Sequence, residues 1–154
     1  MNKLKINIFY LLIFISISIN AFSQESKKNY LNIESDQLVN KQSSLISKFV
    51  GNVYASDQIN HFWGDIMIIE YDENKKIKMV ILKNNVRIER LNEKATGNFA
   101  SYNPKTELIE ITGNVAISKN GNVLTGEKLT MDLISSTSII VGNKDKQVSA
   151  KISN

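Results

Sequence analysis

Apolar and polar residues alternate through most of the chain after residue 30. In segment 107–118, for example, Ile109, Ile111, Val115 and Ile117 are in phase. A period of two is typical of a half-buried β-strand with one apolar and one polar face. Similar alternation predicts further short strands at 31–34, 48–55, 65–71, 77–82, 86–91, 123–133 and 138–141. Beyond the first 23 residues no stretch has convincing helical periodicity, so we predict an all-β domain.

Glycine and asparagine recur in a fixed frame along these strands. In each case a Gly-Asn or Asn-Asn pair precedes valine, and another glycine follows 13 residues after the first position. The three copies are Gly51-Asn-Val53 with Gly64, Asn84-Asn-Val86 with Gly97, and Gly113-Asn-Val115 with Gly126. Gly and Asn tolerate positive φ, so we expect strands to end there and the chain to bend or bulge.

The frame extends upstream and defines a repeat. A degenerate half-unit, 35–40, gives unit starts at 35, 64, 97 and 126, spaced by 29, 33 and 29 residues. Such a period is typical of stacked supersecondary units. Segment 37–47 is ambiguous, since Leu38, Leu45 and Ile46 also fit a short helix, and we follow the repeat in predicting strand, turn and strand. Asn120-Gly121 is a hairpin signal, and the tail from Gly142 is charged and mostly polar.

The first 23 residues have the pattern of a signal peptide. Lys3 and Lys5 precede a 14-residue stretch, Ile6 to Ile19, that is apolar except for Asn7, Ser16 and Ser18. Small residues at the positions before Gln24 predict cleavage after Ser23 and export of the rest of the chain. The alternative is an uncleaved anchor, although a membrane span needs about 20 apolar residues. The domain proper is then 24–154.

Composition excludes several classes of function. Without residues 1–23 the chain carries 17 basic and 15 acidic residues, a net charge of +2. No basic run with interleaved aromatic residues occurs, so we expect no nucleic-acid partner. The chain has no cysteine, which excludes disulfides and thiolate metal sites.

Residues with catalytic potential are few. His61 is the only histidine, and no serine lies in a nucleophile motif. The acidic residues at 65, 70, 72 and 73 lack the frame of a calcium loop, and Asp36 and Asp132 fit turn positions better than a carboxylate pair. Trp63 fits packing or an edge position. We therefore predict no enzyme activity, no metal and no cofactor.

The remaining indication of function is the shape that the predicted strands would form. Strands with one apolar face can bury those faces in a closed core, or leave them lining a groove open to an acyl chain. The strands at the two ends of such a stack have unpaired edges, which can pair with another chain.

Four segments together resemble a known family. They are Ile33-Glu-Ser-Asp-Gln37, Phe49-Val-Gly-Asn-Val53, the segment from Gly97 to Tyr102, and Leu108-Ile-Glu-Ile-Thr-Gly-Asn-Val115. They are similar to the OstA-like family of periplasmic lipopolysaccharide (LPS)-transport proteins, the family of LptA. The resemblance covers about residues 31–150. One Gly-Asn-Val alone is weak, but three in frame behind Ile-Glu-Ser-Asp-Gln are specific.

The resemblance implies a single β-jelly-roll of stacked antiparallel strands with an open apolar groove. It implies that the groove holds the lipid A acyl chains of LPS, without bond chemistry, while an ATPase elsewhere supplies energy. It implies edge-strand pairing with LptC-like inner-membrane and LptD-like outer-membrane partners, and head-to-tail self-association. Lipid-binding residues carried over by phase are Ile33, Phe49, Val53, Met67, Ile69, Ile88, Tyr102, Ile111, Val115, Ile117 and Met131.

Two alternatives to a soluble lipid bridge stay open at this point. One is a membrane-anchored, LptC-like component of the same machine, in which residues 1–23 are retained. The other is an envelope scaffold that binds no lipid because its own side chains fill the interior. The chain also ends soon after the last repeat unit, so we expect a short or absent C-terminal extension, which leaves the extent of self-assembly open.

Overall fold

The computed structural model describes residues 30–40 and 44–153. Over these residues the chain is all β, as predicted, and no helix there is long and apolar enough to cross a membrane. The predicted signal peptide, 1–23, lies outside the described residues. The strands are β1 (Asn32–Glu34), β2 (Gln37–Asn40), β3 (Ile46–Ser56), β4 (Asn60–Tyr71), β5 (Ile77–Arg90), β6 (Glu93–Asn103), β7 (Leu108–Lys119), β8 (Asn122–Asp132), β9 (Thr137–Val141) and β10 (Ser149–Lys151).

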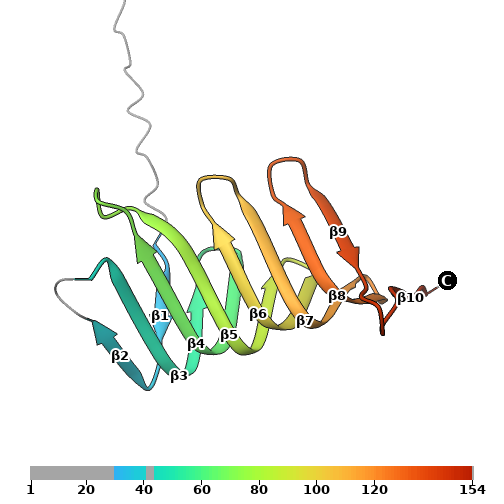
Figure 1. Cartoon of the computed structure of the whole chain (residues 1–154), viewed down its shortest axis with the longest axis horizontal. Coiled ribbons are helices and arrows are strands. Elements are labelled where there is room, and N and C mark those ends of the chain that lie inside the picture. Colours follow the sequence, from blue (N-terminus) through green and yellow to red (C-terminus); the bar gives the residue numbers. More distant parts are fainter. Residues whose placement is uncertain (1–29, 41–43, 154) are drawn as a thin grey trace, which may run out of the picture.

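The strands form one antiparallel stack that follows the sequence order (Figure 1). Strands β3 to β8 are long and pair consecutively. At the N-terminal end β1 and β2 pair with opposite halves of β3, and at the C-terminal end β10 and β9 pair with opposite halves of β8. The two ends do not pair with each other, so the sheet is not closed.

Each odd-numbered long strand bends where the sequence frame places its Gly-Asn or Asn-Asn pair. Both residues of each pair have positive φ: 82° and 45° at Gly51 and Asn52, 59° and 51° at Asn84 and Asn85, and 80° and 52° at Gly113 and Asn114. Each pair opposes one residue of the following strand, which is the geometry of a β-bulge. The ladder then resumes, so the strand turns a corner without ending.

The second glycine of each frame provides the space for these corners. Val53, Val86 and Val115 are almost fully buried, and each pairs directly with its frame glycine. A Cβ at Gly97 would contact Cγ2 of Ile111 and lie 3.2 Å from the carbonyl oxygen of Thr112. The repeat in the sequence is therefore a repeat of sheet corners.

The core fills the inside of the folded sheet. Cross-strand register aligns the inward residues in rows, and their most buried members lie nearest the corners. The largest fully buried side chains are Met67, Ile111, Leu129, Val53, Val86 and Val115. Alternating β-branched and long apolar residues suit this packed, pleated surface.

Three details of the predicted strands are wrong, and the first is that they omit β6 (Glu93–Asn103). The sequence suggests separate strands on either side of Asn84-Asn85, but β5 runs through them because two residues with positive φ bend a strand while its ladder continues. The tail from Gly142 is not without structure, because β10 pairs with residues 123–125 of β8. In 37–47 the structure has strands at 37–40 and from 46, as the repeat predicts, while 41–43 lie outside the described residues.

Candidate functional site: a groove with two unlike lips

The bent strands end at two lips. One lip carries the turns at 72–76, 104–107 and 133–136, which lie along the upper edge in Figure 1; we call it the apolar lip. The other carries the turns at 57–59, 91–92 and 120–121; we call it the charged lip. Each long strand runs from one lip, over its corner, to the other.

Short polar side chains fix these turns. On the apolar lip an oxygen of Asp72, Asn103 or Asp132 accepts the backbone N–H two residues on, at 2.9, 3.0 and 2.9 Å respectively. On the charged lip Asp57 accepts the backbone N–H of Ile59 at 2.9 Å and of Asn60 at 2.8 Å. Such local bonds favour turns over continued strands, so the strands end at defined points.

Two rows of inward-facing residues, one toward each lip, give the lips their different chemistry. Near the apolar lip a cross-strand row runs through Ile69, Val80, Tyr102, Ile109 and Met131. Near the charged lip the equivalent row runs through Asn60, Arg90, Glu93, Lys119 and Asn122. The same fold therefore presents hydrocarbon on one side of the opening and charge on the other.

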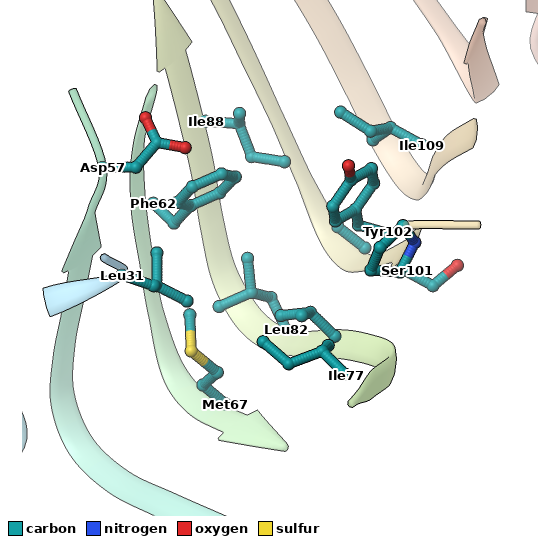
Figure 2. Close-up of a pocket in the computed structure, with 13 residues that line it drawn as sticks. Leu31, Asp57, Phe62, Met67, Ile77, Leu82, Ile88, Ser101, Tyr102 and Ile109 are labelled. Carbon is teal, nitrogen blue, oxygen red and sulfur yellow. The ribbon is translucent and has the colours of Figure 1, made fainter. Parts of the chain in front are cut away.

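An apolar cavity of about 210 Å³ lies in the N-terminal half of the groove. Figure 2 shows its side chains converging from several strands, with Phe62 and Ile88 near the charged lip, Tyr102 and Ile109 on the other side, and Asp57 at the rim. It is smaller than the roughly 300–1,000 Å³ of a typical ligand pocket. A long or branched ligand therefore requires neighbouring space as well.

That space continues toward the C-terminal end. A neck of about 30 Å³ shares Phe62, Ile88 and Ile109 with the apolar cavity. Beyond the neck lie a polar cavity of about 310 Å³, which spans both lips, and a further cavity of about 330 Å³ that reaches Ile152. The neck shares Met131 with the polar cavity and Ile117 with the last one. Because they share wall residues, the four cavities lie next to one another along the groove inside the bent sheet.

Two titratable groups at the apolar cavity have shifted pKa values. Burial raises the pKa of Asp57, but hydrogen bonds from the Asn60 side chain and from the backbone of Ile59 and Asn60, with the nearby His61, outweigh it, so the pKa lies below its ordinary value. Burial, followed by the charges of Glu107 and Asp57, raises the pKa of the Tyr102 phenol. At neutral pH the rim therefore carries an ionised Asp57 and a neutral Tyr102.

All eleven residues predicted from the sequence as lipid-binding face the inside of the fold, in the core cluster or packed against it. Five line these cavities: Met67, Ile88, Tyr102, Ile117 and Met131. The other six line none of the four cavities described here; of these, Val53, Ile69, Ile111 and Val115 are buried and Ile33 and Phe49 are partly buried. Contact of all eleven with lipid stays a prediction.

Sequence reasoning missed two groups of groove residues. One consists of apolar neighbours such as Phe62, Leu82 and Ile109, and the other consists of Arg90, Glu93 and Lys119. The signal for the second group is phase: Arg90 lies two residues after inward-facing Ile88, and Lys119 lies two residues after Ile117. In this chain, a charged residue at an inward-facing position just before a turn therefore indicates the opening of the groove.

The residues considered for catalysis or metal binding lie elsewhere. His61 and Trp63 are on the outer face, where the hydroxyl of Tyr54 lies 2.9 Å from Nδ1 of His61 and the Arg87 guanidinium lies 3.6 Å from the centre of the Trp63 ring. Asp65 accepts hydrogen bonds from Asn85. Within 30–40 and 44–153, no group of three or more His, Cys, Asp or Glu residues is placed to hold a metal ion.

An unclosed antiparallel sheet bent around an apolar groove defines a β-jelly-roll of the LPS-transport class. Residues 32–137 match the family described as "LptA/(LptD N-terminal domain) LPS transport protein", and the chain belongs to this family of transport proteins. It acts as an LPS-transport component of the LptA type.

A solved structure agrees with this fold. The crystal structure of LptH, the LptA-homologous periplasmic component of the LPS transport device of Pseudomonas aeruginosa, matches with a TM-score of 0.72. The match covers 81% of this chain and 96% of that one, at 14% sequence identity, so it supports the fold alone. No curated protein matches the sequence.

Proposed function

We propose that the protein is a periplasmic, non-enzymatic conduit that holds the acyl chains of LPS in its groove as the lipid moves toward the outer membrane. Export with cleavage after Ser23 is part of this proposal. The observation that carries it is the row of adjoining cavities inside the bent sheet, lined by the half-buried Tyr102, Ile117 and Met131, in a member of an LPS-transport family.

The partly filled interior is suited to transient binding. Each methylene taken out of water contributes about 0.8 kcal/mol, so a few methylenes in a cavity of 210 Å³ are held with modest affinity. The neck is narrow, so a chain that passes it must displace half-buried side chains such as Phe62. Weak sites in series allow a lipid to enter and also to leave.

The two ends of the stack support assembly into a longer bridge. Leu38 and Val39 on β2 are 56% and 40% exposed, and Ile139 and Val141 on β9 are 58% and 45% exposed. Apolar end strands with a free edge are suited to pairing with another sheet. We infer LptC-like and LptD-like partners at these ends, with head-to-tail self-association as a further possibility.

Specific observations separate this function from its alternatives. The cavities disfavour a scaffold whose interior is filled, although the corner positions are indeed packed. A membrane-anchored, LptC-like role requires the N-terminal segment to be retained. Mass spectrometry of the protein isolated from cells tests this point: a first residue of Gln24 supports the soluble conduit, and an intact N-terminus supports the anchor.

Site-specific photocrosslinking in cells tests lipid binding. A photoreactive residue replaces Tyr102, which lines the apolar cavity, or Glu110, which lies on the outer face and pairs with Lys128. The account expects LPS adducts at position 102 and none at 110. A folded, exported protein without adducts at 102 would favour the scaffold.

A further inference from the structure

Arg90 is a half-buried cation that faces the groove. It is the last residue of β5 and lies on the inward face, two residues beyond Ile88. It lines both the neck and the polar cavity. Arg90 therefore lies where the apolar part of the groove meets its polar mouth.

Arg90 differs from the neighbouring cations in its partners. Lys119 is paired with Glu93, and Arg87, on the outer face, lies 3.7 Å from Glu89 and stacks over Trp63. Within the described part of the chain, Arg90 has no such ion pair or side-chain hydrogen bond. Its donors are thus available to a ligand, and arginine presents them in a planar fork that fits phosphate oxygens.

The charged side chains along the groove differ between the apolar cavity and the polar cavity. Asp57 is the only acidic or basic side chain lining the apolar cavity, and its negative charge disfavours an anion there. In the polar cavity the carboxylate of Glu93 is held by Lys119, and that of Asp132 accepts the backbone N–H groups of Ile134 and Ser135. Arg90 is therefore the charge on this wall that lacks a compensating partner.

We infer that Arg90 binds the phosphate group of an amphiphile whose acyl chains lie in the apolar cavity and the neck. This inference rests on the proposed function and adds an orientation to it. The acyl chains extend toward the N-terminal half of the groove, and the phosphate stays at the mouth of the C-terminal half. Free phosphate has the same chemistry, but only a lipid also fills the apolar cavity.

The test compares two lipids and two arginines. Purified parent protein, Arg90→Gln and Arg87→Gln are titrated with bisphosphorylated lipid A and with the same lipid after removal of both phosphates. We expect Arg90→Gln to weaken binding of the phosphorylated lipid about ten- to a hundredfold, the loss of a charge-assisted contact. Binding of the dephosphorylated lipid should change less than about twofold, a difference of roughly 0.4 kcal/mol. Arg87→Gln is the matched control on the same strand and should change neither.

A second variant and a second probe complete the test. Glu93→Gln releases Lys119 beside Arg90 and should strengthen binding of the phosphorylated lipid alone. Equal losses for both lipids in Arg90→Gln, or no loss, would overturn the inference, because the side chain would then act through packing or not at all. Inorganic phosphate that competes fully with the lipid would also overturn it. Failure of the parent protein to bind either lipid would instead reject the proposed function.

Discussion

The two lips of the groove are made by the same strands and yet differ in chemistry. Along the apolar lip an inward-facing row consists of Ile69, Val80, Tyr102, Ile109 and Met131, whereas along the charged lip the equivalent row includes Arg90, Glu93 and Lys119. Corners and turns fix the shape of both lips, and the last inward positions of each strand give each lip its chemistry. The shape thus follows from the repeat, while the polarity of each lip follows from the residues at the strand ends.

We expect the largest effect on stability from a substitution in the buried core between the two lips. Ile111 is 0% exposed, so Ile111→Asp buries an unpaired carboxylate and removes packed methyl groups. We expect the free energy of unfolding, measured with urea, to fall by about 4 kcal/mol or more, a large part of the roughly 5–15 kcal/mol of an ordinary domain. Thr112→Asp, the next residue and opposite Lys128 on the outer face, is the control and should change stability by less than about 0.5 kcal/mol. A fully stable Ile111→Asp would contradict the assigned inner face.

The corner between the lips should be the next most sensitive region. In Gly97→Ala the new Cβ meets Cγ2 of Ile111, and overpacking of this kind costs about 1–3 kcal/mol. The variant Ile111→Ala removes that methyl group. Unfolding of both single variants and the double variant should give a coupling energy above about 0.5 kcal/mol in favour of the double variant. If the free-energy changes of the two single variants simply add, the contact with Ile111 is not the reason that position 97 requires glycine.

A substitution on the apolar lip alone should weaken lipid binding with little loss of stability. Tyr102→Asp places a carboxylate at the wall of the apolar cavity but leaves the corner packing intact. We expect LPS binding to weaken about tenfold or more, or about 1.4 kcal/mol. Stability should fall far less than in Ile111→Asp, and Glu110→Gln is the outer-face control. Unchanged lipid binding by folded Tyr102→Asp would remove the apolar lip from the site.

The smallest effect is a pH dependence at the rim of the charged lip. The folded-state pKa of Asp57 is below its ordinary value of 3.8. Its ionised form therefore stabilises the fold above that ordinary value, and this contribution is lost as the pH falls through the lower, folded pKa. Because the group is only partly buried and solvent screens its interactions, we expect Asp57→Ala to cost about 1 kcal/mol or less at pH 7. The difference from the parent should vanish in acid, and a difference that persists below both pKa values would assign Asp57 a role independent of charge.

The sequence predicts the repeating architecture well, for a physical reason. Positive φ is costly for most residues, so Gly51-Asn52 and Gly113-Asn114 mark the corners directly. Asn84-Asn85 predicts a break between two strands, because two consecutive residues that favour positive φ are also typical of an ordinary turn. The strand β10 was missed because three residues beside a charged tail carry little periodicity, and only pairing with β8 orders them.

The site was less predictable than the fold. Alternation shows which residues face inward, but it does not show how deeply each one is buried. Ile111 is packed in the core, whereas Ile117, on the same face of the same strand, lines two cavities. That distinction depends on the distance of each residue from its corner, which only the register supplies. Arg90 was missed because a charged residue at the end of an apolar phase is usually read as the start of a turn.

Methyl NMR of the complex with LPS measures the central claim most directly. The account predicts intermolecular NOEs from acyl-chain protons to the methyl groups of Ile88 and Ile117, which line the groove. Ile66 and Ile68 of β4 lie on the opposite face of the sheet and should show none. Contacts to Ile66 and Ile68, with none to Ile88 and Ile117, would place the lipid outside the fold and contradict the account.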